Sequence, residues 1–473
     1  MMKSYTELYI DGGWTPANGQ DRAVINPATE AIIASVREAD ASDVDRAVSA
    51  ARRAFDSWAA TSAEQRSRYI AAICDKLEQR QEQLARTITE EMGMPLHLSR
   101  GWQVAGPISG MRAYIERAYL MEQLSGDSHS VISREPIGVC AFITPWNVPL
   151  HQLVGKVAPA LAAGCTMVLK PSEMTPLHAY LFAEVVDEVG LPAGVFNLVC
   201  GDGPAVGAPL CRHPQVDMVS FTGSTGAGVK IAQAAAPSIK RVCQELGGKS
   251  PFIITEDADF SAAIEYGVRD VMVNSGQICC SLTRMLVPQN RYQEAVELAR
   301  QVAEGLQVGD PMDDNSFMGP LSSAAQRERV RSYISRGVEE GATLVTGGME
   351  PPVGLDQGYY VRPTIFANVD NRMAIAREEI FGPVLCLIPY RDIDEAISIA
   401  NDTPYGLSAA VWAADAEQAQ QIGRKIRAGQ VNVNGGGWNY TAPFGGYKQS
   451  GNGREWGDEG LAEFVEIKSM QFP

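Results

Sequence analysis

The chain has 473 residues, enough for two or three domains at roughly 100–200 residues each. Hydrophobic residues make up 45% and charged residues 20%, which excludes a mainly disordered chain. The formal net charge of −16 would repel a polyanion, so we do not expect a nucleic acid as partner.

The first part of the chain predicts short strands followed by helices. Segments up to about residue 40 are typical of strands joined by Gly and Asn turns. A helix is expected from Ser42, with Asp45 three residues on in a loose capping box. One longer helical stretch is expected over about 63–92. The polar span Met121–Ser133 predicts a hairpin-like arm that reaches away from the body.

From Ile137 onward, apolar runs alternate with helical segments. Each run of the first block ends in a small or polar residue followed by Pro or Gly. This alternation is typical of βαβ units and a parallel sheet, whose ligands bind at the carboxyl ends of the strands. The tail, residues 461–472, offers a strand for pairing with another chain. The expected strands are 138–143, 167–169, 195–199 and 218–221 in a first block, and 252–254, 285–287, 344–346 and 384–389 in a second.

Several whole classes of protein do not fit the pattern. The longest nearly apolar stretch, Val157–Leu169, is shorter than the about 20 residues of a membrane span, and the first residues lack the apolar core of a signal peptide. Nine cysteines without a CxxC pair predict neither a disulfide framework nor a zinc ribbon, and the five histidines lack metal-binding spacing. We therefore expect a cytoplasmic protein with no membrane partner and no metal.

Two segments carry candidates for covalent and acid–base chemistry. Cys279, in Gly276-Gln277-Ile278-Cys279, is either a buried structural thiol or a nucleophile activated by its surroundings. Glu245, which comes before Gly247-Gly248, is either a solvated carboxylate at a turn or a general base. Because no histidine follows residue 213, a carboxylate base is the simpler choice in this half of the chain.

Two further segments lie at predicted strand ends. The glycine-rich turn Phe221–Gly228 precedes a helical pattern and is either a tight turn or a phosphate-binding helix start. It matches neither G-x-G-x-x-G nor the P-loop. Asn147, within Thr144–Pro149, either caps the next helix or donates a hydrogen bond to a developing oxyanion.

Taken in this order, the segments resemble the aldehyde dehydrogenase superfamily. The resemblance runs from Ile25–Thr29 to Pro443–Lys448 and includes Glu378–Val384 and Asn401–Leu407, so it covers nearly the whole chain. It implies an α/β fold with a Rossmann-like dinucleotide-binding domain, an α/β catalytic domain and a small β bridging element for a homodimer or homotetramer. The implied limits are 1–118 and 137–247 for the first domain, 248–448 for the second, and 119–136 and 449–473 for the bridging element.

The resemblance also implies roles. Cys279 matches the nucleophile, Glu245 the general base and Asn147 the oxyanion donor, for oxidation of an aldehyde to a free acid rather than a coenzyme A ester. The implied cofactor is NAD, because Glu173 would hydrogen-bond a ribose 2′-hydroxyl and repel a 2′-phosphate; NADP is the alternative, since Lys170 and Ser172 would accept that phosphate. The implied cofactor-binding residues are Thr144, Pro145, Trp146, Lys170, Ser172, Glu173, Gly203, Gly223, Ser224, Gln326, Glu379 and Phe381.

The expected substrate pocket departs from common members of the superfamily. Val148 and Gly155 stand where aromatic residues are frequent, which predicts a wider tunnel and weakens the case for a cationic aldehyde such as betaine aldehyde. His151 lies either in the pocket wall or on the helix surface, and Tyr440 is expected in an aromatic rim. The predicted substrate is a bulky aromatic or medium-chain aliphatic aldehyde. The predicted pocket residues are Val148, His151, Gly155, Ile278, Cys280, Trp438 and Phe444.

Two alternatives stay open at this point. A semialdehyde or phosphorylated-aldehyde specialist would need an anion-binding arginine in the pocket, for which Arg112 and Arg284 are the candidates, although Arg284 suits a structural role better. A non-catalytic scaffold of the same fold would be expected to lack Cys279, Glu245 or Asn147, and all three are present.

Overall fold

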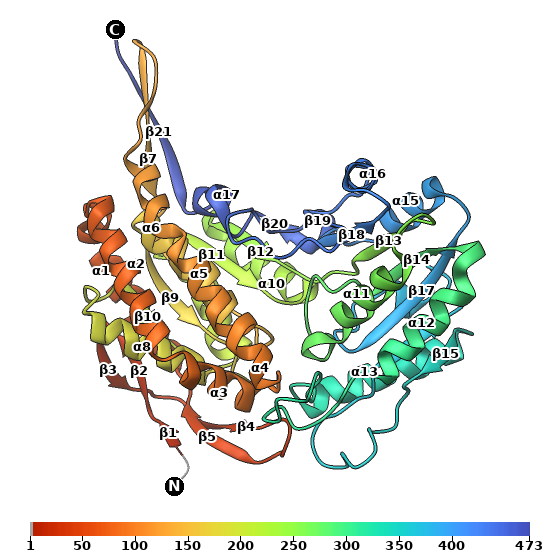
Figure 1. Ribbon diagram of the computed structural model, residues 1–473. Helices are drawn as coiled ribbons and strands as arrows, with labels where there is room; N and C mark the ends of the chain where they lie inside the picture. The colour runs from red at the N-terminus through yellow and green to blue at the C-terminus, as the bar shows by residue number, and fades with distance from the viewer. Residues whose placement is uncertain (1–2) are drawn as a thin grey trace.

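Two open sheets, each covered by helices, form the two lobes of the molecule in the computed structural model, which describes residues 3–473 (Figure 1). The first lobe is built on an eight-stranded sheet whose central strands are parallel. Four of these strands are buried along their whole length, as expected for a sheet with helices on both faces. In spatial order the strands are β20 (Gly451–Asn452), β12 (Arg241–Glu245), β11 (Met218–Thr222), β8 (Val139–Ile143), β9 (Thr166–Lys170), β10 (Phe196–Leu198), β2 (Glu7–Ile10) and β3 (Gly13–Pro16).

Helices from several parts of the chain cover this sheet. Helices α1 (Ala41–Ala59) and α7 (Pro149–Ala163) contact β9, α8 (Leu177–Val189) contacts β10, and α10 (Thr225–Ala235) packs on β11 and β12. The remaining helices of this lobe are α2 (Ala63–Gln79), α3 (Gln81–Met92), α4 (Leu96–Leu98), α5 (Gly106–Arg112), α6 (Tyr114–Arg117) and α9 (Ala208–Arg212). A separate three-stranded sheet near the N-terminus has the order β1 (Lys3–Tyr5), β5 (Ile32–Arg37), β4 (Asp21–Ile25).

The second lobe is a seven-stranded sheet, parallel except at the β15 edge. Alternate residues point to opposite faces: Leu286 joins one hydrophobic core, and Met285 and Val287 join the other. In spatial order the strands are β15 (Thr343–Thr346), β16 (Thr364–Ala367), β17 (Val384–Tyr390), β14 (Arg284–Pro288), β13 (Pro251–Ile254), β18 (Ser408–Trp412) and β19 (Gln430–Val433). The helices are α11 (Phe260–Met272), α12 (Tyr292–Glu304), α13 (Ala324–Glu339), α14 (Ala374–Arg377), α15 (Ile393–Asn401) and α16 (Ala416–Gly423). The predicted α/β class is confirmed.

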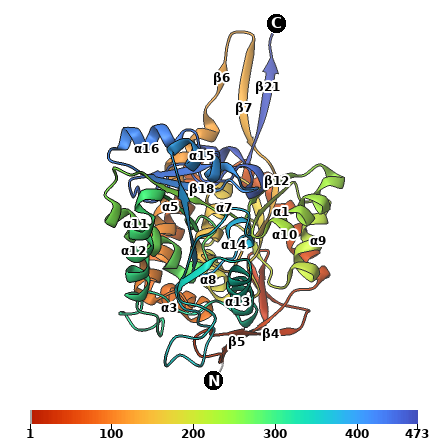
Figure 2. The same ribbon diagram turned by 90° about the vertical axis from the view of Figure 1, so that its right-hand side faces the viewer.

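A long arm projects from the body, as Figures 1 and 2 show. It consists of the hairpin β6 (Ser125–Gly126) and β7 (Ser130–Pro136), with β21 (Val465–Gln471) antiparallel to β7. The predicted strand in the tail therefore exists, but it pairs within its own chain. β20 and helix α17 (Gly457–Ala462) come from the same C-terminal segment, so residues 449–473 complete the first sheet as well as the arm.

Two helix predictions are wrong in detail. α1 begins after Asp40, whose carboxylate accepts hydrogen bonds from Ser42 N and Asp43 N while Asp43 bonds back to Asp40 N. The capping box therefore lies two residues before the predicted one. The stretch 63–92 is two helices, α2 and α3, because Arg80 leaves the helical backbone with φ −105° and ψ 13°. Its guanidinium binds Glu184 on α8 at 2.8 Å.

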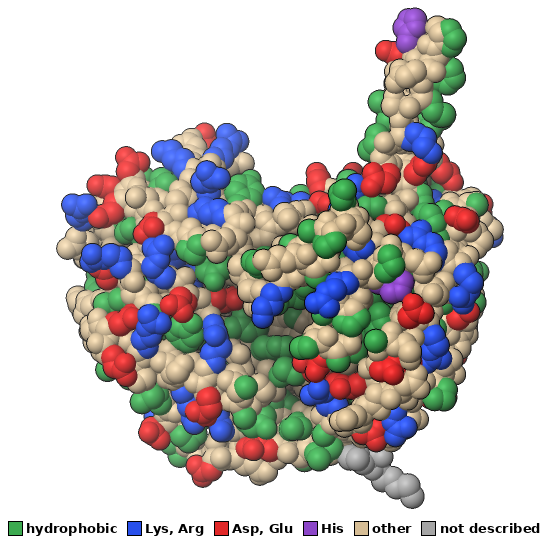
Figure 3. Space-filling view, turned by 180° about the vertical axis from the view of Figure 1, so that it is seen from behind, with side chains coloured by type: hydrophobic (Ala, Val, Ile, Leu, Met, Phe, Trp, Pro, Cys, Tyr) green, Lys and Arg blue, Asp and Glu red, His purple; other side chains and the backbone are tan. Residues whose placement is uncertain are grey.

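The face of the molecule opposite to Figure 1 is hollowed between the lobes (Figure 3). Hydrophobic side chains lie in its depth, and Lys and Arg side chains lie at its margin. Among residues 3–473, no helix is long and apolar enough to cross a membrane, and no group of His, Cys, Asp and Glu in that range has the arrangement of a metal site.

Candidate active site

The loop of Cys279 connects α11 to β14 and has an unusual backbone. Asn274 and Ser275 have φ values of 55° and 56°, and Gly276 has a φ of 71°. A side chain at Gly276 would collide with the backbone of Gly382, so glycine is required there. Such left-handed residues persist where the surrounding structure holds them, and they cluster at functional sites.

Asn147 joins the first lobe to this loop. Its Nδ2 donates a hydrogen bond of 2.8 Å to the carbonyl of Gln277, two residues before Cys279. The backbone carbonyl of Asn147 accepts hydrogen bonds from Gln103 Nε2 at 3.1 Å and from Asn274 Nδ2 at 3.0 Å. The alternative that Asn147 caps the next helix is wrong, because α7 begins at Pro149 and has no side-chain cap. The amide keeps a second hydrogen for another acceptor.

Glu245, at the carboxyl end of β12, is buried, with 4% of its surface exposed. The alternative of a solvated turn carboxylate is therefore wrong. Neither of its carboxylate oxygens has a hydrogen-bond partner among residues 3–473. Burial, and then the charge of Glu455, raise the pKa of Glu245 well above its usual value, although Lys156 opposes them. A buried carboxylate left without partners is rare and suits a group that handles protons.

A buried ion pair lies beside Glu245. Lys156 on α7 binds Glu455, and its Nζ also donates to Thr222 Oγ1 at 2.7 Å. The two charged side chains are only 1% and 8% exposed. Their separation along the chain leaves no local pattern, so the sequence did not reveal this pair.

The thiol of Cys279 is partly buried at the inner end of the site. A hydrogen bond with Cys280, followed by burial, raises its pKa well above the usual value, and the charges of Glu379 and Glu455 act in the same direction. At neutral pH this thiol is therefore protonated, and it needs a base before it can act as a nucleophile. Val148, Ile278 and Cys280 flank the catalytic candidates and are partly buried.

Nine of the predicted cofactor-binding residues lie at the carboxyl edge of the first sheet. Lys170 ends β9, and its Nζ donates to Pro171 O at 2.9 Å and Gly201 O at 2.8 Å, with Glu173 at 3.6 Å. Ser224 caps α10 through a bond from Ala227 N at 3.3 Å. The others follow strand ends of the same sheet: Thr144, Pro145 and Trp146 after β8, Ser172 after β9, Gly203 after β10 and Gly223 after β11.

The second lobe supplies the other predicted cofactor contacts. Glu379 accepts a hydrogen bond of 3.0 Å from Gly248 N, and burial raises its pKa to about 7. Gln326 Nε2 donates to the carbonyl of Phe381 at 2.7 Å and so fixes its backbone, where φ is 62°. The rings of Phe381 and Trp146 meet edge to face at 5.3 Å, which brings the two groups of residues together.

His151 packs among the aromatic rings of Trp438, Tyr440, Phe444 and Trp456, a cluster called the aromatic wall below. The His151 ring has centroid distances of 5.3 Å to Trp438, 5.6 Å to Tyr440 and 5.0 Å to Trp456. Trp438 also meets Phe444 at 4.9 Å. His151 therefore belongs to an aromatic cluster and does not lie on a free helix surface.

The expectation of a wider tunnel at Gly155 is corrected by Trp456. A Cβ added to Gly155 would lie 3.2 Å from the Trp456 ring and 3.3 Å from Glu455 Oε2. The space is therefore filled by a ring from a distant segment. The argument from Gly155 against a cationic aldehyde loses its basis, since an aromatic ring is present there after all. Trp456 was missed because a lone Trp before a helix carries no signal of this contact.

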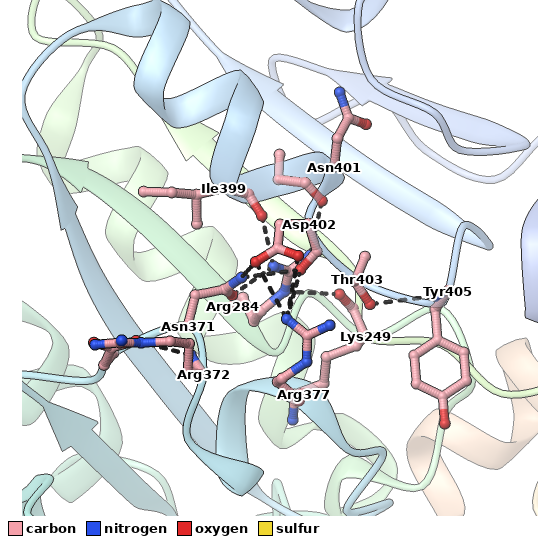
Figure 4. Close-up of polar contacts among 12 residues, drawn as sticks. Lys249, Arg284, Asn371, Arg372, Arg377, Ile399, Asn401, Asp402, Thr403 and Tyr405 are labelled. Atoms are coloured by element: carbon pink, nitrogen blue, oxygen red, sulfur yellow. Dashed lines mark hydrogen bonds and ion pairs between the residues drawn. The ribbon is translucent and has the colours of Figure 1, made fainter.

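Neither candidate arginine lies in the wall. Arg112 is on the outer surface and pairs with Asp75 at 2.6 Å and Glu78 at 2.9 Å. Arg284 is buried in the second lobe and donates to the carbonyls of Lys249, Ile399 and Ala400 and to Asn371 (Figure 4). Arg284 thus has the structural role that the sequence favoured.

Comparisons with known proteins give matches over nearly the whole chain. The sequence profile of the aldehyde dehydrogenase family matches residues 14–470. A "3-succinoylsemialdehyde-pyridine dehydrogenase" from Pseudomonas sp. is 52% identical over 473 residues, which are 99% of each chain. A variant of aldehyde dehydrogenase C from Pseudomonas syringae, solved with NAD+ and octanal, is 50% identical with a TM-score of 0.95, over 98% of this chain and 96% of that one. An aldehyde dehydrogenase from Mycobacterium tuberculosis, solved with NAD+, is 43% identical with a TM-score of 0.97, over 100% and 99%. This chain belongs to the aldehyde dehydrogenase family.

Proposed function

We propose that this aldehyde dehydrogenase oxidises a bulky aromatic or medium-chain aliphatic aldehyde to the free carboxylic acid, with NAD as its cofactor. The observation that carries the proposal is the hydrogen bond of 2.8 Å from Asn147 Nδ2 to Gln277 O. It holds an amide donor of one lobe against the loop of Cys279 in the other, as acyl chemistry at a thiol requires. Glu245 completes the set as a buried carboxyl group.

The residues fit a dinucleotide at the edge of the first sheet. A Cβ added to Gly203 or Gly226 would have no described atom within 4 Å, so the backbone there can approach a phosphate closely. α10 begins just after Ser224, and its N-terminal N–H groups and dipole favour an anion. Thr144 Oγ1 is buried without a partner in the described chain. Glu173, 3.6 Å from Lys170, favours a 2′-hydroxyl over a 2′-phosphate, and so NAD over NADP.

The first step is addition to the aldehyde. The Cys279 thiol first gives its proton to water; Sγ then attacks the carbonyl carbon as the thiolate, a C–S bond forms, and the carbonyl oxygen takes the electron pair. The donors to that oxygen are the free hydrogen of Asn147 Nδ2 and the N–H of Cys279. Removal of one such donor typically raises the activation free energy by about 3 kcal/mol. Bound NAD would supply the acceptor for the hydride that leaves the carbon, which then becomes a thioester.

Glu245 carries the second step. Its carboxylate takes a proton from a water molecule, which attacks the thioester carbonyl; the C–S bond breaks and the acid is released. The raised pKa of Glu245 makes it a stronger base than an ordinary carboxylate. The charge of Lys156 favours the ionised form of Glu245, and the charge of Glu455 favours the protonated form.

Two relatives support the substrate class. One is named for a pyridine-bearing semialdehyde and the other was solved with octanal. Both of these aldehydes are larger than a two-carbon aldehyde. The aromatic wall around His151 offers apolar surface to either aldehyde. A semialdehyde specialist is the second candidate, favoured by the first of these names. An anionic form of it would lack an arginine partner from Arg112 or Arg284, which lie outside the wall.

A panel of aldehydes tests the proposal. NADH and NADPH formation would be measured with acetaldehyde, octanal, benzaldehyde, succinic semialdehyde and betaine aldehyde, for the parent protein and Cys279→Ala. We expect the parent to reduce NAD with octanal or benzaldehyde at a higher kcat/KM than with acetaldehyde, and Cys279→Ala to be inactive while still binding NAD. A higher kcat/KM for acetaldehyde would refute the substrate class, and an active Cys279→Ala would refute the nucleophile.

The arm and the cysteines bear on assembly and location. β21 is an edge strand of the arm, and Ile467, Met470 and Phe472 are exposed on or beside it. Such an edge suits pairing with a second copy, so the proposal includes a homodimer or homotetramer. All nine cysteines are free thiols, which suits the reducing cytoplasm.

A further inference from the structure

The wall of aromatic rings contains polar atoms that are poorly paired. Tyr440 OH and His151 Nδ1 are 3.4 Å apart, a long contact for two groups that can both donate and accept. Trp456 Nε1 is buried and has no partner within residues 3–473. His151 and Tyr440 are only partly buried, so their polar atoms are open to a further hydrogen-bond partner such as a ligand.

The His151–Tyr440 pair lies within an aromatic cluster that has one exposed and one buried tryptophan. Both Trp438 and Trp456 meet the His151 ring; Trp438 is 39% exposed, whereas Trp456 is fully buried. The cluster thus runs from the surface toward the interior. His151 lies one helical turn before Gly155 and Lys156, which contact Trp456 and Glu455. The pair therefore lies between the solvent and the buried acid–base cluster beside Glu245.

Tyr440 is held in place by two glycines. Side chains at Gly106 and Gly110 of α5 would collide with the Tyr440 ring or hydroxyl, so this helix lets the tyrosine lie directly on its backbone. The ring also meets Trp456 edge to face at 5.0 Å and Trp438 at 5.9 Å. Its hydroxyl is thereby fixed next to His151, and a fixed polar group discriminates between ligands better than a mobile one.

We propose that the His151–Tyr440 pair determines specificity by binding a hydrogen-bonding group on an aromatic aldehyde, such as a phenolic hydroxyl or a pyridine nitrogen. The inference rests on the proposed function, whose substrate class it narrows. Whichever ring nitrogen of His151 carries the proton, the pair offers one donor and one acceptor to the ligand. Burial, and then the charge of Lys156, lower the pKa of His151 to about 3, so the imidazole is neutral at physiological pH.

Other ligand chemistries fit this wall less well. A purely aliphatic chain would leave the polar atoms unpaired, at a cost in binding. An anionic group would need a free cation, but Lys156 is bound to Glu455 and Thr222. A quaternary ammonium group would fit the rings but would not satisfy the donors of His151 and Tyr440. A neutral aromatic ring with one polar substituent satisfies both the rings and the polar atoms.

Size-matched aldehydes provide the test. The acid products of benzaldehyde, para-hydroxybenzaldehyde and nicotinaldehyde would be quantified by chromatography, and each polar aldehyde's kcat/KM divided by that of benzaldehyde. Dividing the parent's ratio by the variant's ratio removes the intrinsic reactivity of the aldehydes. We expect Tyr440→Phe and His151→Leu each to lower the ratio about tenfold for at least one polar aldehyde, and the double variant to lower it no further.

The control is Tyr119→Phe, which alters an exposed tyrosine outside the cluster and should leave the ratios as in the parent. If the kcat/KM ratios are unchanged in both Tyr440→Phe and His151→Leu, the inference is overturned while the proposed function stands. A parent that prefers betaine aldehyde to every aromatic aldehyde would also overturn it. If the parent oxidises no aldehyde of either panel, the proposed function fails, and the inference fails with it.

Discussion

The two ends of the site are built in different ways. At the reaction end, polar side chains are bound to backbone atoms: Asn147 to Gln277, and the Gln277 side chain to Asn274 O at 3.0 Å and Ser322 N at 2.9 Å. At the proposed aldehyde-binding end, rings from distant segments pack around His151 with one long polar contact. Backbone bonds fix geometry, whereas ring packing tolerates change, which is why we propose that the first end sets the reaction and the second selects the substrate.

The largest expected effect is at the reaction end. Glu245→Gln removes the base but keeps the shape, so the thioester should form once and then accumulate. We expect one NADH per subunit in a rapid burst, then turnover slowed about 1,000-fold, because general-base catalysis contributes about 100- to 10,000-fold. Intact-protein mass spectrometry should find the acyl adduct. Glu135→Gln in the exposed arm is the matched control. Unimpaired steady-state turnover by Glu245→Gln would remove this residue from the mechanism.

Measuring kcat/KM over a range of pH sharpens the comparison, because only the groups at the reaction end should change their protonation. The pKa values of Cys279 and Glu245 are raised, so both groups are protonated at low pH and lose their protons as the pH rises. Glu379, with a pKa of about 7, also loses its proton as the pH rises through that value. We expect kcat/KM to rise at least about tenfold between about pH 6 and about pH 8.

The selectivity between two aldehydes should stay constant over the same range. With a pKa of about 3, His151 does not titrate there, and the wall keeps one charge state. The measurement is kcat/KM for benzaldehyde and para-hydroxybenzaldehyde in parallel. The phenol itself ionises, so the series stops below its pKa. A ratio that changes with pH while the phenol stays neutral would place an ionising group in the wall and contradict the division between the two ends.

The smallest expected effect comes from rebuilding the wall. Gly155→Trp places a second ring against Trp456, and we expect it to lower kcat/KM for benzaldehyde about fivefold, since overpacking costs about 1–3 kcal/mol. Adding Trp456→Leu makes room for the new ring and should recover most of the loss. Thermal unfolding of each variant separates lost folding from lost binding. Equal defects in the single and double variants would show that the two positions do not share one space.

Much of the reaction end could be predicted from the sequence because its residues stand at strand ends and in glycine-bearing turns. Cys279, Glu245 and Asn147 each have a local pattern, and parallel strands bring their ends to one edge. The packing of Trp456 into the space at Gly155 has no such pattern, because it depends on two segments that meet only in the folded chain.

The errors in the helices have the same origin. Arg80 has no helix-breaking signal, and the break between α2 and α3 coincides with its ion pairs to carboxylates on α8. The Lys156–Glu455 pair was also invisible, since charged residues are exposed in most proteins and nothing local marks these two as buried. Contacts of this kind are tertiary, and local propensity does not encode them.

The arm has a practical consequence for handling the protein. β21 runs to Gln471 at its tip, far from the N-terminal strands (Figure 1). A purification tag fused to the C-terminus would extend directly from the edge strand that we propose for subunit pairing. A tag fused before β1 would emerge on the opposite side of the body. Recombinant preparations meant for kinetics should therefore carry the tag at the N-terminus, and a C-terminal fusion offers a simple way to disturb assembly on purpose.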